Sequence, residues 1–64
     1  MAKYDVTVKL SGEDGNAFAV LGKVRKALKN AGASPADLYT FTTHATSGDY
    51  DHLLQTCMKW VNVE

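Results

Sequence analysis

The second half of the chain contains five residues whose side chains could do acid–base, nucleophilic or metal chemistry: His44, Asp49, Asp51, His52 and Cys57. Asp49 and His52 are three positions apart, so on a helix their side chains can meet. Cys57 falls on the apolar side of the same predicted helix, away from His52, so no nucleophile–base pair is expected. The histidines and the cysteine also lack the paired spacing of zinc ligands. We therefore expect no catalytic residues, no metal and no cofactor.

Residues 11–18, SGEDGNAF, raise the question of phosphate binding, because a glycine-rich turn leads here into a predicted helix. Glu13 and Asp14 place negative charge where a phosphate would sit. The segment also lacks the lysine and the glycine spacing of phosphate-binding motifs. We interpret it as a turn with acidic capping, in which Ser11 with Asp14, or Asp14 itself, caps the helix.

The densest cluster of like charge is KVRKALK at residues 23–29, and its cations form the candidate interaction surface: Lys23, Arg25, Lys26 and Lys29. A solvated helix face explains most of this pattern, because cations favour the later part of a helix. The alternative is a surface for an acidic protein or for nucleic acid. Seven basic and seven acidic residues cancel over the chain, so no global field attracts nucleic acid or an anionic membrane.

Apolar periodicity predicts the elements that must position these residues. Residues 4–10 alternate strictly and predict a half-buried strand. Residues 16–31 follow helical spacing, with Phe18 and Leu21 opening the apolar arc and Gly32 ending the helix. Ser34 and Pro35 then form a helix start, and Asp49 caps a third helix.

The segment LYTFTTHAT at residues 38–46 is the ambiguous part of this assignment, because its threonines and aromatic residues favour a strand. The strong start signal at Ser34, the shared face of Leu38, Phe41 and Ala45, and the break at Gly48 favour a helix. The terminal VNV alternates again and is the candidate partner of the first strand.

These elements predict an α+β fold, a small single domain over residues 1–64 with the order β-α-α-α-β. Three helices pack on a short two-stranded antiparallel pair, formed by the N-terminal strand and the C-terminal VNV. If VNV is too short, the strand's partner is the same strand of a second copy. The expected core comprises Leu21, Val24, Leu28, Leu53, Leu54 and Trp60.

Chain length and composition indicate how such a domain is stabilised and in which cellular compartment we expect it. A chain of 64 residues buries a marginal core, and its single cysteine cannot form an internal disulfide, so oligomerisation would add stability. No apolar run reaches the length of a membrane span, and the charged start lacks the apolar centre of a signal peptide. We therefore expect a cytoplasmic protein without membrane contact.

Three stretches carry a resemblance: GEDGNAF at residues 12–18, ATSGDY at residues 45–50, and a following pattern of Leu53-Leu54 and Met58-x-Trp60-Val61. Together with Arg25, Leu28 and Gly32 they resemble a group of short uncharacterised bacterial and bacteriophage proteins. The resemblance implies a bacterial or phage origin and favours helix for residues 38–46. It implies no activity and no site residue.

The sequence thus favours a non-catalytic protein-interaction or regulatory module without a small-molecule substrate. The binding surface is expected on the basic face of the first helix or on the strand edge. The partner is an unknown protein, or a second copy paired through the open strand edge. The alternative is a nucleic-acid-binding protein that uses Lys23, Arg25, Lys26 and Lys29.

Overall fold

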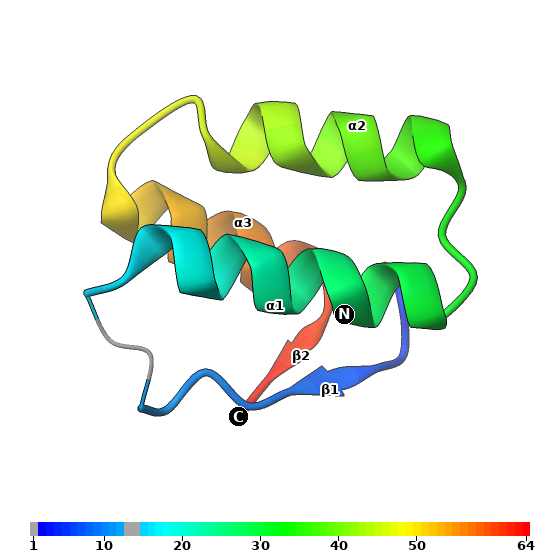
Figure 1. Cartoon of the computed structure of the whole chain (residues 1–64), viewed down its shortest axis with the longest axis horizontal. Coiled ribbons are helices and arrows are strands. Elements are labelled where there is room, and N and C mark those ends of the chain that lie inside the picture. The colour runs from blue at the N-terminus through cyan, green and yellow to red at the C-terminus, as the bar shows by residue number, and fades with distance from the viewer. Residues whose placement is uncertain (1, 13–14) are drawn as a thin grey trace.

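The computed structural model describes residues 2–12 and 15–64, so Glu13 and Asp14, expected at a helix start, lie outside the described residues. The elements follow in the order β1 (Thr7–Val8), α1 (Ala17–Asn30), α2 (Pro35–Ala45), α3 (Tyr50–Trp60) and β2 (Asn62–Val63). Figure 1 shows α2 on one side of α1 and the strands on the other, with α3 behind α1. The predicted β-α-α-α-β order is confirmed.

Helix α1 begins at Asn16, whose side-chain oxygen accepts a hydrogen bond from the backbone N–H of Ala19 at 3.1 Å. Asn16 is thus the N-cap of α1. The expected capping by Ser11 with Asp14, or by Asp14 itself, involves a residue outside the described ranges. At the other end Gly32 adopts a φ of 93°, and the N–H of Ala33 bonds to the carbonyl of Leu28. This Schellman arrangement satisfies the last carbonyls of α1, as the predicted glycine stop requires.

Helices α2 and α3 begin where the sequence places their caps. The Ser34 hydroxyl accepts from the N–H of Asp37 at 3.1 Å, and the Asp49 carboxylate accepts from the N–H of His52 at 2.9 Å. The ambiguous residues 38–45 are helical, as predicted. The Thr42 hydroxyl donates to the Leu38 carbonyl at 2.8 Å, so a threonine that disfavours helix is accommodated within its own helix.

The two strands run parallel, so the predicted antiparallel pair is wrong. Each helix crosses the domain once, and Figure 1 shows α1 and α3 running in one direction and α2 in the other. Three crossings return the chain to the end of the domain at which β1 started. β2 must then follow the direction of β1, as in any crossover connection between adjacent strands.

Hydrogen bonds join the N-terminal segment to the end of the chain over a longer stretch than the regular strands. Lys3 and Tyr4 donate their N–H groups to the carbonyls of Lys59 and Trp60, both at 2.9 Å, and so cap the end of α3. At the far end the N–H of Leu10 reaches the Glu64 carbonyl at 3.1 Å. The inner edge of the N-terminal segment is therefore bonded to the end of the chain from Lys3 to Leu10.

The core lies between the helices and the sheet and, among the described residues, combines eleven buried apolar side chains: Val8, Leu10, Val20, Val24, Leu28, Phe41, Ala45, Leu53, Cys57, Trp60 and Val61. Of the predicted core, Val24, Leu28, Leu53 and Trp60 are buried, whereas Leu21 and Leu54 are only partly buried at its margin. Trp60 packs edge-on against Phe41 at 5.6 Å between ring centroids and stacks on Tyr4 at 6.3 Å.

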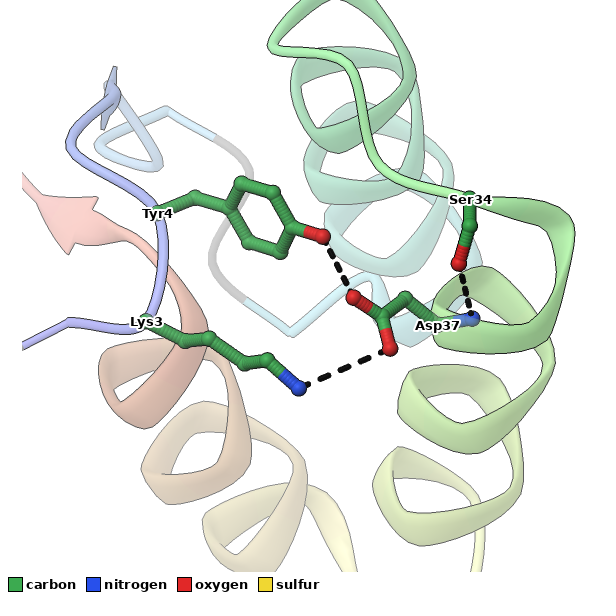
Figure 2. A network of polar contacts seen from close by, with 4 residues as sticks. All are labelled: Lys3, Tyr4, Ser34 and Asp37. Carbon is green, nitrogen blue, oxygen red and sulfur yellow. Dashed lines mark hydrogen bonds and ion pairs between the residues drawn. The ribbon is translucent and has the colours of Figure 1, made fainter.

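A polar cluster ties the start of the chain to the start of α2 (Figure 2). The Tyr4 hydroxyl donates to the Asp37 carboxylate, and the Lys3 ammonium lies 3.5 Å from the same carboxylate. The Lys3 ammonium also lies 4.6 Å from the centroid of the Trp60 ring, a cation–π distance. The hydrogen bond from Tyr4 and the nearby charge of Lys3 lower the pKa of Asp37, and the same bond raises the pKa of Tyr4.

None of the helices within the described ranges combines the length and the apolar character needed to cross a membrane.

Candidate functional site

Two of the acid–base candidates, Asp49 and His52, shape the turn between α2 and α3, while the Asp51 carboxylate accepts a hydrogen bond from Gln55 within α3. The Asp49 carboxylate caps α3, while the His52 ring nitrogen Nε2 lies 2.9 Å from the His44 carbonyl and 3.2 Å from the Ser47 hydroxyl. A Cβ added to Gly48 would lie 2.9 Å from the His52 side chain, so a glycine is needed beneath this ring. The His52 ring therefore stabilises the turn through its contacts with His44 and Ser47, and it is not paired with the Asp49 carboxylate.

Cys57 is fully buried, and burial raises the pKa of its thiol to about 11. A thiol with so high a pKa is a poor nucleophile near neutral pH, because the reactive species is the thiolate. Among the described residues, no group of three or more histidine, cysteine, aspartate and glutamate side chains is placed to hold a metal ion.

Three of the four predicted basic residues gather at a hollow beside α2. Arg25, Lys26 and Lys29 line this hollow of about 290 Å³ together with Leu38, and Lys23 is not part of its lining. Within residues 2–12 and 15–64 the one ion pair joins Lys3 to Asp37. The three cations of the hollow therefore have no carboxylate within ion-pair distance in that part of the chain.

A second hollow, of about 240 Å³, lies beside the first turn of α1 and is mainly apolar. Its lining includes Ala17, Phe18 and Leu21 of α1, Ala45 of α2, and Tyr50 and Leu53 of α3. The Phe18 side chain is 88% exposed, so its expected place on the buried arc of the helix is wrong. The hydroxyl of Tyr50 accepts from the N–H of Gly15 at 3.0 Å and holds the entry to α1 against α3.

Both hollows lie along the same side of α1, the side that faces α2. Phe18, Gly22, Arg25 and Lys29 follow one another at spacings of four, three and four residues. At 100° per residue these positions fall within an arc of about 60° on the helix surface. We call the two hollows and this stripe between them the α1–α2 groove. It is apolar at the start of α1 and basic near the end of α1.

Gly22 lies in the middle of this stripe and has no structural role in the fold. Its φ is not positive, and a Cβ built on it would meet no atom within 4 Å. A glycine within a helix costs about 0.5–1 kcal/mol relative to alanine. The sequence contains the signal, a glycine inside a strongly periodic helix, but Gly22 was not among the predicted site residues. Gly22 lines neither hollow, and the surface between the two hollows carries no side chain at this position.

Comparison of the chain with protein-family models, curated proteins and solved structures found no match to any of them. The resemblance to short bacterial and bacteriophage proteins therefore stays a prediction, and function has to be argued from the α1–α2 groove alone.

Proposed function

We propose that the protein is a non-catalytic binding module whose α1–α2 groove holds a segment of a partner protein. The segment carries a large apolar side chain at one end and acidic side chains at the other. The observation that carries the proposal is the alignment of an exposed apolar hollow and a basic hollow along one side of α1. An amphipathic segment with those two ends is complementary to both.

The charge of the basic hollow supports an acidic occupant. Lys29 lies in the last turn of α1, where a cation complements the helix macrodipole. Arg25 and Lys26 lie before that turn, so the macrodipole does not explain them. Carboxylates of a partner would pair with these exposed cations beside Leu38, and the bound segment itself would exclude part of the water that screens them.

The apolar end supports a protein partner over nucleic acid. A fully exposed phenylalanine beside a hollow that reaches the buried Leu53 and Ala45 offers an anchoring position for one partner side chain. Nucleic acid would use the cations but would leave this end empty. The balance of seven basic and seven acidic residues also provides no general attraction to phosphate.

The length of the groove sets the size of the bound segment. Phe18 and Lys29 are eleven positions apart, which corresponds to about 16 Å along α1 at 1.5 Å per residue. An extended peptide of about five residues, or a helix of about three turns, spans this distance. Gly22 permits the backbone of such a segment to approach α1 closely at its centre.

Selection of displayed random 12-residue peptides against the immobilised full chain tests the proposal. We expect the enriched peptides to combine acidic residues with a large apolar residue and to bind more weakly as salt rises. Charge reversal by Arg25→Glu with Lys29→Glu should weaken the best peptide by about tenfold or more, and Phe18→Ser should weaken it by a similar factor. Lys59→Glu, an exposed lysine of α3 outside the groove, is the matched control.

Two results would overturn the proposal. One is a set of enriched peptides without acidic residues, or peptides whose affinity does not respond to the groove variants. The other is tight binding of a single-stranded oligonucleotide that falls steeply with salt and is lost in Arg25→Glu with Lys29→Glu but kept in Phe18→Ser. That result would favour nucleic acid, because phosphate contacts release counterions and do not require the apolar end.

A further inference from the structure

The outer edge of β1 is an open hydrogen-bonding surface on the side of the molecule formed by the sheet. Bonds to the C-terminal segment use alternate residues of the first strand: the Val6 and Val8 carbonyls accept from Asn62 and Glu64, and the Leu10 N–H donates to Glu64. In a parallel pair the residues between these turn their N–H and C=O groups the other way. Thr7 and Lys9 therefore present their backbone groups along the free edge.

The side chains along this edge carry opposite charges at equal distances on either side of Thr7, so the pattern is complementary to its own reverse. Asp5, Thr7 and Lys9 are exposed and alternate with Val8 and Leu10, which are buried beneath the helices. Thr7 lies midway between an acid and a base. The Asp5 carboxylate accepts a hydrogen bond from the Asn62 amide at 3.2 Å, and within the described ranges neither Asp5 nor Lys9 has an ion-pair partner.

We infer that this edge binds a second copy of the chain, with the two β1 strands antiparallel and centred on Thr7. In this register Thr7 faces Thr7 of the second copy, and Asp5 of each copy faces Lys9 of the other. Both cross-strand charge pairs are attractive, and threonine pairs are favourable on an exposed sheet face. The result is a four-stranded sheet with the order β2-β1-β1-β2, closed by a two-fold axis.

Charge pairing favours this register over the registers that are shifted by two residues. A shift by two residues in one direction places Lys3 opposite Lys9 of the second copy, a repulsive pair. A shift in the other direction places Asp5 opposite Ser11 and removes both charge pairs. A second copy is favoured over an unrelated strand because the pattern Asp-x-Thr-x-Lys is complementary to its own reverse.

The pairing is short. The N–H of Val6 bonds to the Tyr4 carbonyl at 2.9 Å, a turn centred on Asp5 that ends the regular strand. Few backbone bonds therefore form across the axis, and the association is weak, with a dissociation constant of roughly 0.1–1 mM. Three or more strands with one apolar face are more stable than two, so self-pairing strengthens the sheet when the chain is concentrated.

Sedimentation equilibrium of the full chain up to about 1 mM, with charge-swap variants, tests the inference. Asp5→Lys or Lys9→Asp alone places like charges opposite each other and should weaken self-association by about tenfold. The double variant Asp5→Lys with Lys9→Asp restores both pairs with their signs exchanged and should recover the dimer. Lys59→Asp, outside the edge, should leave the association unchanged. Circular dichroism establishes that each variant is folded.

A wild-type chain that stays monomeric at about 1 mM would overturn the inference. So would a dimer that does not respond to either single swap, or a double swap that fails to recover it. Loss of the Asp5–Asn62 bond cannot imitate the expected result, because the double variant lacks that bond as well. The test is independent of the α1–α2 groove: peptide binding by a strict monomer would leave the proposed function standing.

Discussion

The two sides of α1 differ in what they contribute to the molecule. The inner side presents Val20, Val24 and Leu28, each buried to 1% exposure or less. The side facing the α1–α2 groove presents Phe18, Gly22 and Arg25, all exposed, and the first two depart from what stability favours. An exposed phenylalanine leaves apolar surface in water, and a mid-helix glycine lowers helix propensity. Arg25 favours the helix and is solvated, but it has no ion-pair partner among the described residues and is available to a partner's carboxylate.

Under the proposed function, the inner side of α1 contributes stability and the groove side contributes binding. Residues that violate local preferences without a structural benefit are concentrated where a partner would remove the cost. Burial of Phe18 and close approach at Gly22 would each turn an unfavourable feature into a favourable contact, and Arg25 would add a charge pair. The comparison predicts that substitutions on the inner side change stability, whereas those on the groove side change binding and leave stability equal or higher.

Truncation of the inner side should give the largest effect. Leu28→Ala removes a fully buried side chain and leaves a cavity, so the free energy of unfolding should fall by about 2–5 kcal/mol. Phe18→Ala is the matched control on the groove side and should change it by less than about 0.5 kcal/mol. Urea denaturation followed by circular dichroism measures both. Equal losses for the two variants would abolish the distinction between the two sides.

The reactivity of the buried Cys57 thiol tests whether the core beneath the inner side of α1 stays closed, and its substitution should have a smaller effect on stability. Because burial raises the pKa of its thiol to about 11, only about one thiol in a thousand is ionised at pH 8. Native protein should therefore react with a thiol reagent far more slowly than urea-unfolded protein. Cys57→Ala should lower stability by about 1 kcal/mol and leave peptide binding unchanged. Rapid labelling of the native chain would show that this part of the core opens readily.

The sequence was sufficient to predict three helices, their order and most of their ends, although not the Asn16 cap of α1, because start and stop signals are local. Ser34, Asp49 and Gly32 act through hydrogen bonds within a few residues, Pro35 acts through its fixed φ, and each appears at its expected place. Strand direction is not local. Alternation in residues 4–10 and in VNV indicates two strands, but their relative direction depends on how many times the chain crosses the domain between them. Three crossings make the pair parallel.

The candidate site was only partly predictable for a related reason. The cluster at residues 23–29 identified Arg25, Lys26 and Lys29, which share a hollow, but it could not separate them from Lys23. Helical spacing placed Phe18 on an apolar arc covering about half of the helix. A domain of 64 residues cannot cover so wide an arc, and which margin remains exposed depends on where α2 packs.

Gly22→Ala sharpens the comparison because its two expected effects have opposite signs. The added methyl group enters open space and improves helix propensity, so the free energy of unfolding should rise by about 0.5–1 kcal/mol. Affinity for peptides selected on the α1–α2 groove should fall. Gly32→Ala is the control: with a φ of 93° it should destabilise the chain instead. A destabilised Gly22→Ala variant would mean that this position packs inside the fold.

The smallest effect is expected at the cluster of Lys3, Tyr4 and Asp37, where it appears as a dependence of stability on pH. The Tyr4 hydrogen bond, followed by the Lys3 charge, lowers the pKa of Asp37 below its usual 3.8. Between that value and the lowered pKa, the unfolded chain binds more protons than the folded chain. The contribution of Asp37 is therefore fully present above pH 3.8 and is lost as pH falls through the lowered pKa.

Thermal unfolding of the wild type, Asp37→Asn and Tyr4→Phe across pH measures this contribution. The thermal midpoint of the wild type should exceed that of Asp37→Asn by a constant amount between about pH 5 and pH 9. This difference in midpoint should shrink below about pH 4. Tyr4→Phe keeps the ring that stacks on Trp60 but removes the hydroxyl that donates to Asp37. The difference in thermal midpoint between the wild type and this variant should therefore shrink in the same acid range. Because the pKa of Tyr4 is raised above 10.0, that difference should also be lost as pH rises through the raised value. Midpoint differences that do not change at either extreme would show that the contact between Tyr4 and Asp37 does not stabilise the fold.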